Sequence, residues 1–120
     1  MPQITVDYSS PVEDGFDREG FARALHGATV EIAGARPEAC KTLFRYSDGR
    51  AFGYEDAERH AVFHVTVGLL AGRSDETKAR LTERTLELLR ACVAPQDGVT
   101  LHASAEVRDL DPSYRTYEGQ

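Results

Sequence analysis

A periodic arrangement of side chains over residues 61–70 constrains this chain more than any other feature of its sequence. One side is apolar and the other is mostly polar or small: Phe63, Val65, Val67 and Leu69 oppose Val62, His64, Thr66 and Gly68. A period of two predicts a strand with one buried face. Ser74 then predicts the N-cap of an amphipathic helix, whose apolar stripe comprises Leu81, Leu88, Leu89, Cys92 and Val93. Residues 99–108 alternate again and predict another strand.

The first half of the chain shows the same succession of strand, helix and strand. Residues 2–8 alternate and predict a strand that starts almost at the first residue. A turn-rich loop is expected over residues 9–15, and Asp17 predicts the N-cap of a helix that ends near Gly34. Residues 39–46 alternate and predict the second strand. The sequence therefore predicts a tandem β-α-β repeat.

This order predicts an α+β, two-layer fold with a four-stranded sheet and both helices on one face. Within each half, about 1–46 and 60–112, a crossover helix makes its two strands parallel. The polar stretch 47–59 shows no sustained period and predicts a long connecting loop. A length of 120 residues predicts a single domain over 1–120. The same element order also fits ferredoxin-like domains, so order alone leaves function open.

Composition and charge narrow the possible partners. The chain has 14 basic and 20 acidic residues, a net charge of −6, so we expect neither nucleic acid nor an anionic membrane surface as a partner. Cys40 and Cys92 lie far apart and no apolar signal segment opens the chain, which indicates a reducing cytoplasm. His64 and His102 fall on polar faces of predicted strands without further ligands at metal spacing, so no metal site is predicted.

Three residues could carry chemistry. Removal of Met1 would leave Pro2 with a free secondary amine, and an arginine about 6 Å away would lower the pKa of that amine by roughly two units. Arg73 lies at a strand-to-helix turn just before Ser74, where backbone donors favour a carboxylate. Arg36 lies at the entrance to the second strand. Each also has an ordinary explanation: an inert chain start for Pro2 and solvated charges for the arginines.

Longer segments carry a specific resemblance. The opening PQITVDYS, the stretch HAVFHVTVGLLAGRSDETKARLTERTLELL and the closing SAEVRDLDP resemble segments of 5-carboxymethyl-2-hydroxymuconate isomerases. The internal GRSDETK also resembles the strand-to-helix turn of 4-oxalocrotonate tautomerases, and both groups belong to the tautomerase superfamily. The sequence differs from the isomerases in a longer 47–59 loop and a shorter tail beyond Pro112.

The resemblance implies a fold, an assembly and roles for the three residues. It implies the tautomerase fold in a homotrimer, with Pro2 as the catalytic acid and base. Arg73 corresponds to the arginine of the GRS turn, and Arg36 to the arginine that opens the second strand, which implies that both bind substrate.

The function that follows is a cofactor-independent isomerase that moves a proton in an enol or dienol carboxylate, in the catabolism of aromatic compounds. No cofactor and no metal are expected. The alternative is a ferredoxin-like module for small-molecule binding or oligomerisation, without catalysis.

Overall fold

The four strands of this protein form one mixed sheet in the order β2-β1-β3-β4. The structure is a computed structural model that describes residues 2–9 and 13–120. Its strands are β1 (Gln3–Ser9), β2 (Lys41–Ser47), β3 (His60–Leu69) and β4 (Thr100–Asp109). β1 pairs with β2 in parallel, β3 pairs with β4 in parallel, and the two halves meet through the antiparallel pair β1 and β3. The expected tandem β-α-β sheet is thereby confirmed.

The pairing also separates this fold from the ferredoxin-like alternative. In a split β-α-β unit another strand lies between the two strands that a helix connects. Here β1 contacts β2 directly and β3 contacts β4 directly, so neither unit is split. The order of elements is compatible with both folds, but the observed order of strands excludes the ferredoxin-like arrangement.

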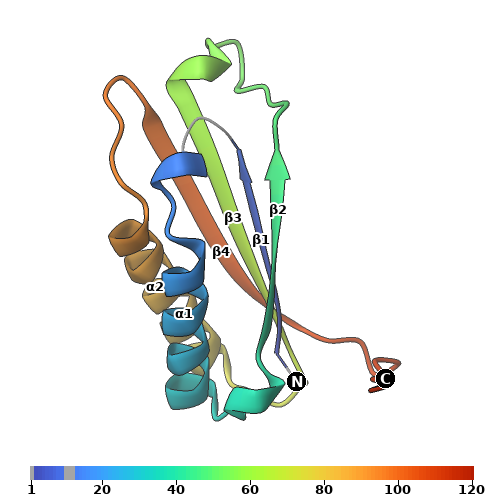
Figure 1. Cartoon of the computed structure of the whole chain (residues 1–120). Helices are drawn as coiled ribbons and strands as arrows, with labels where there is room; N and C mark the ends of the chain where they lie inside the picture. Colours follow the sequence, from blue (N-terminus) through green and yellow to red (C-terminus); the bar gives the residue numbers. More distant parts are fainter. Residues whose placement is uncertain (1, 10–12) are drawn as a thin grey trace.

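Two helices cover one face of the sheet and pack against each other (Figure 1). They are α1 (Arg18–Ala33) and α2 (Asp75–Cys92). The predicted caps are present: the Asp17 carboxylate accepts from the backbone N–H of Gly20, and the Ser74 hydroxyl accepts from that of Thr77. Gly34 ends α1 with a φ of 70°, a left-handed conformation that glycine adopts without steric cost.

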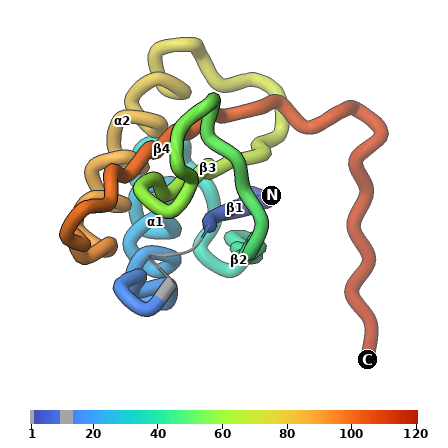
Figure 2. Tube along the Cα trace, turned by 90° about the horizontal axis from the view of Figure 1, so that it is seen from above, coloured from blue at the N-terminus to red at the C-terminus, as the bar shows by residue number. Residues whose placement is uncertain are grey.

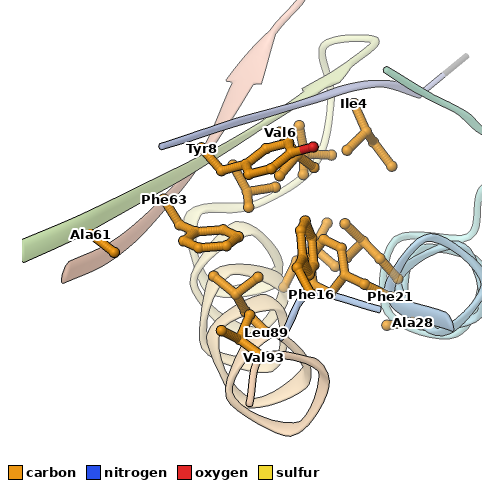
Figure 3. Packing of buried hydrophobic residues seen from close by; sticks show 14 of the residues in the cluster. Ile4, Val6, Tyr8, Phe16, Phe21, Ala28, Ala61, Phe63, Leu89 and Val93 are labelled. Carbon is orange, nitrogen blue, oxygen red and sulfur yellow. The ribbon is translucent and has the colours of Figure 1, made fainter. Parts of the chain in front are cut away.

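The core fills the space between the sheet and the helices (Figure 3). Inward side chains of β1 and β3 are almost fully buried against apolar residues of the helices. The strand contribution is Ile4, Val6, Tyr8, Ala61, Phe63, Val65, Val67 and Leu69. Phe16, just before α1, lies edge-on to Phe63 with ring centroids 4.9 Å apart. The opposite face of the sheet carries polar side chains, such as the ion pair between Asp7 and Arg45.

Two expected boundaries need correction. The second strand starts at Lys41 and not at residue 39, because the short 3-10 helix η2 (Pro37–Ala39) precedes it and Pro37 fixes a helical φ there. Of the turn-rich loop expected over residues 9–15, Ser9 belongs to β1 and η1 (Glu13–Gly15) is a 3-10 turn. Residues 10–12 lie outside the described part.

The loop expected over residues 47–59 is more ordered than its composition suggests. It contains the 3-10 helix η3 (Ala57–Arg59) and a bridge between Phe52 and Glu55. The Arg50 side chain is only 9% exposed, and its Nε donates to the carbonyl oxygens of Ala57 and His60. The buried guanidinium of Arg50 binds these two carbonyls and so holds the loop against the start of β3.

Within residues 2–9 and 13–120, no helix is long and apolar enough to cross a membrane.

Candidate functional site

The strand register brings several chain segments to one end of the sheet. Gln3 pairs with Lys41 on one side and with Gly68 on the other, and Gly68 pairs with Arg108. Pro2 directly precedes Gln3, so it lies level with the start of β2 and the last residues of β3. In Figure 1 the start of β1 lies close to the segment that joins η2 to β2.

Pro2 is a buried residue at this end. Its carbonyl oxygen accepts a hydrogen bond of 3.4 Å from the backbone N–H of Lys41, which extends the parallel ladder between β1 and β2 by one step. The backbone position of Pro2 is therefore fixed by the sheet. Met1, on whose removal the predicted amine depends, lies outside the described residues.

A cleft of about 490 Å³ opens at this end of the sheet. Pro2 is not among the described residues that line it, but the next residue, Gln3, and Lys41, the hydrogen-bond partner of Pro2, are. One side is formed by Gln3, Arg36, Glu38, Ala39 and Lys41, and the other by residues 114–118 of the carboxyl-terminal tail. Viewed from above, the tail extends away from the body of the molecule and runs back alongside it at a distance (Figure 2). The cleft is thus bordered on one side by residues that flank Pro2.

Arg36 and Lys41 supply positive charge to the cleft. Arg36 is exposed and forms an ion pair with Glu38, with 2.8 Å between Nη2 and Oε1. A backbone hydrogen bond of Glu38 and its contact with Arg36 hold the pKa of the Glu38 carboxyl below its ordinary value. Lys41 Nζ donates to the carbonyl oxygen of Ala39 at 3.2 Å. The Lys41 ammonium lines the cleft and contacts a carbonyl oxygen, so its charge can attract an anion there.

Arg73 occupies a different place from Arg36. Its Nε donates to the carbonyl oxygen of Ala33 and its Nη1 to that of Leu70, both at 3.1 Å. These bonds join the last residue of α1 to the turn between β3 and α2. Arg73 is not one of the described residues that line the cleft. A guanidinium has five donors, so three N–H groups of Arg73 are not engaged in these two bonds.

The histidines singled out in the sequence have structural partners. His102 Nε2 lies 2.9 Å from His60 Nδ1, and His64 lies 2.6 Å from the Ser104 hydroxyl and 3.1 Å from Glu106. No group of three His, Cys, Asp or Glu side chains that could hold a metal ion occurs among residues 2–9 and 13–120.

Comparisons with known proteins identify the fold. No protein-family model and no curated protein matches this sequence. Among solved structures, a 5-carboxymethyl-2-hydroxymuconate isomerase from Deinococcus radiodurans R1 is similar, with 17% identity, a TM-score of 0.75 and coverage of 99% of this chain and 90% of that one. The chain has the tautomerase fold. A fused 4-OT symmetric trimer shares 21% identity, with a TM-score of 0.68 over 90% of this chain and 85% of that one.

A third structure with the tautomerase fold broadens the comparison. FG41 malonate semialdehyde decarboxylase, inhibited by 3-bromopropiolate, shares 21% identity, with a TM-score of 0.64 over 98% of this chain and 91% of that one. At such identities the likeness shows the fold alone. The roles of Pro2, Arg36 and Arg73 therefore depend on the geometry of this chain.

Within this tautomerase fold, Arg36 is the one described cleft residue that the sequence predicted as part of a site. Gln3, Lys41 and Tyr114 are among those that it did not predict. Gln3 and Lys41 become visible only through the pairing of β1 with β2, which places them side by side. Tyr114 lies in a tail without periodicity, so no sequence signal indicates that it approaches β1. Its hydroxyl accepts a hydrogen bond of 3.0 Å from Gln3 Nε2.

Proposed function

We propose that this protein is a cofactor-independent tautomerase or isomerase that moves a proton within an enol or dienol carboxylate, with the amine of Pro2 as acid and base. The observation that carries the proposal is the position of Pro2. It is buried at the end of the sheet, next to Gln3 and hydrogen-bonded to Lys41, and both of these residues line the cleft. The tautomerase fold of the chain supports the same reaction class.

The proposed reaction needs only proton transfers. The neutral secondary amine of Pro2 takes a proton from the enol hydroxyl or from carbon, and the resulting ammonium returns a proton to another carbon, so charge and atoms balance. Arg36, with Lys41 beside it, binds a substrate carboxylate and stabilises negative charge that develops in the transition state. Arg73 does not line the cleft in the single chain; we propose it as a second group that binds a carboxylate, through the N–H donors not engaged with Ala33 and Leu70. The amine exists only in a chain from which Met1 has been removed.

The names of similar solved structures support a proposal for the substrate class and the assembly. Structures similar to this chain carry the names 5-carboxymethyl-2-hydroxymuconate isomerase and 4-OT symmetric trimer. We propose a related carboxylate-bearing enol as substrate, in the cytoplasmic catabolism of aromatic compounds, and a homotrimer as the working assembly. The chemistry requires neither a metal nor a cofactor.

The test compares two forms of one protein. An untagged, mass-verified chain that starts at Pro2 is assayed with 2-hydroxymuconate beside the same chain carrying one additional amino-terminal residue. The extended chain should be nearly inactive, because an amide nitrogen neither accepts nor donates the proton. Activity of the Pro2 form should rise with pH as the amine loses its proton and becomes able to act as a base. Pro2→Ala keeps a primary amine and is the weaker test.

Equal rates for the two forms would show that the amine is idle. The protein would then be a binding or oligomerisation module that uses the tautomerase fold without its chemistry.

A further inference from the structure

The carboxyl-terminal tail leaves the sheet along a defined path. The backbone N–H of Leu110 donates to the carbonyl oxygen of Leu69, and the Leu110 side chain lies over Gly68. A methyl group added at Gly68 would lie 2.8 Å from Leu110 Cδ2, so the absence of a side chain at Gly68 makes room for this contact. The first residue after β4 is therefore packed against the end of β3, one strand away from Gln3.

A turn at residues 111–114 then redirects the tail. The backbone N–H of Tyr114 donates to the carbonyl oxygen of Asp111 at 2.9 Å, and the Asp111 carboxylate accepts from the backbone N–H of Ser113 at 2.8 Å. This pattern is a turn stabilised by an aspartate at its first position. Arg115 Nη1 donates to the carbonyl oxygens of Pro112 and Tyr114 and braces the same turn.

The side chain of Tyr114 connects this turn to the candidate site. Its hydroxyl accepts from Gln3 Nε2, and Gln3 is the residue that follows Pro2. From Tyr114 onward the tail forms the side of the cleft that faces Arg36 and Lys41. The hydrogen bond between Gln3 and Tyr114 thus sets how far the tail stands from the two cations.

We propose that Tyr114 is a positioning residue that holds residues 114–118 as one wall of the cleft, so that this wall contributes to substrate binding. The inference rests on the proposed function, since it assigns the wall to the cleft that Gln3 and Lys41, the neighbours of Pro2, line on the other side. Arg36 and Lys41 hold the carboxylate on one side, while the tail encloses the part of the substrate that faces away from them. A wall of this kind acts on binding and leaves the proton transfers at Pro2 unchanged.

The decisive variant is Tyr114→Phe, which removes one hydroxyl oxygen and keeps the ring. Tyr54→Phe is the matched control, since Tyr54 is fully exposed and lies in the 47–59 loop, away from the cleft. The Michaelis constant for 2-hydroxymuconate should rise about threefold to tenfold in Tyr114→Phe, the range expected for loss of one hydrogen bond, with kcat unchanged. Tyr54→Phe should match the wild-type protein. A chain ending at Pro112 should show the larger loss.

Binding of muconate, a dicarboxylate without the enol hydroxyl, gives a readout independent of turnover. Titration of the protein with muconate, followed by NMR, should show the same loss of affinity in Tyr114→Phe. Unchanged affinity and an unchanged Michaelis constant, or no binding of muconate to the wild-type chain, overturn the inference. So does a fall in assembled mass in Tyr114→Phe, because the tail would then serve assembly.

The same experiment separates this inference from the proposed function. Weaker muconate binding in Tyr114→Phe, without any activity that depends on the Pro2 amine, would support the role of residues 114–118 in binding. It would contradict the proposal that the protein is an enzyme. Activity that depends on Pro2, with a Michaelis constant unaffected by Tyr114→Phe and by truncation, would support the proposed enzyme. It would contradict the role of residues 114–118 in substrate binding.

Discussion

The side chain of Arg73 combines a structural role with a proposed role in substrate binding. The sequence places Arg73 at a turn where nothing in the core depends on it, which predicts an effect on substrate binding larger than the effect on folding. The structure adds a stabilising role, because the guanidinium donates to the carbonyl oxygens of Ala33 and Leu70. The carbonyl of Ala33 is one of the carbonyls at the end of α1 that have no partner inside the helix. Arg73 is thus both a structural residue and a proposed carboxylate ligand.

Arg73→Ala should therefore lower both stability and activity. Loss of two hydrogen bonds from a half-buried charged group should reduce the free energy of unfolding by about 1–2 kcal/mol. The specificity constant for a carboxylate enol should fall about tenfold or more. Urea denaturation and steady-state kinetics measure the two effects. Arg23→Ala, which removes an exposed ion pair with Glu19, is the control and should cost less than about 1 kcal/mol. Normal turnover in Arg73→Ala would leave Arg73 with its structural role alone.

His26 makes the stability of the fold dependent on pH. Its Nε2 lies 2.7 Å from the Thr42 hydroxyl, which joins α1 to β2, and burial lowers the pKa of its imidazole. The folded state therefore binds fewer protons than the unfolded state just below pH 6.5, and stability falls as the pH falls below that value. His26→Gln should flatten the dependence of the unfolding free energy on pH between about 7 and 5. Thr42→Ser keeps the hydroxyl and should retain the wild-type slope, and an unchanged slope in His26→Gln would contradict this assignment.

Among the helices and strands, the capping residues define where each helix begins and where α1 ends. Asp17 and Ser74 start the two helices, and Gly34 turns the chain out of α1 toward Arg36. The turn before α2 contains Arg73, so the Ser74 cap fixes the backbone beside this proposed ligand. Local sequence signals therefore position the two arginines, although they do not determine what the side chains contact.

Ser74→Ala tests this dependence on the cap. The substitution removes the oxygen that accepts from the N–H of Thr77, and should lower the free energy of unfolding by about 1 kcal/mol. Ser74→Asp retains an acceptor at the positive end of α2 and should restore most of the loss. Chemical denaturation of the three proteins measures both changes. Equal stability of the alanine variant and the wild-type protein would show that the cap is not needed.

At the scale of the whole molecule, both edges of the sheet are open. Among residues 2–9 and 13–120, β2 pairs only with β1 and β4 only with β3, so each presents unpaired backbone groups along one edge. Such edges favour association with further chains. The polar face of the sheet, opposite the helices, is also uncovered within the single chain (Figure 1).

We predict that the protein is a homotrimer in solution. Assembly is expected because it would cover the open edges of the sheet. Three subunits are expected because similar 4-OT structures are described as symmetric trimers. Light scattering at micromolar concentration should give about three times the chain mass of 13.2 kDa. A monomer or a dimer would contradict the prediction.

Local sequence patterns are sufficient to predict which elements form and in what order. Alternation along β1 and β3, the helical stripe of α2 and the caps Asp17 and Ser74 are local patterns, because they reflect the geometry of one element against one buried face. The same patterns located Pro2 at the start of a strand. Element order also left the ferredoxin-like fold open, since strand pairing depends on contacts between distant segments.

The strand order and the lining of the cleft depend on contacts between segments that are distant in the sequence. Lys41 approaches Pro2 because β2 pairs with β1, and Tyr114 reaches Gln3 although 111 positions separate them. Arg73 is held by the carbonyl oxygens of Ala33, at the end of α1, and of Leu70, after β3, and no pattern in the sequence indicates these two partners. A side chain's partner across the fold is set by packing and register, and neither has a local period from which it can be predicted.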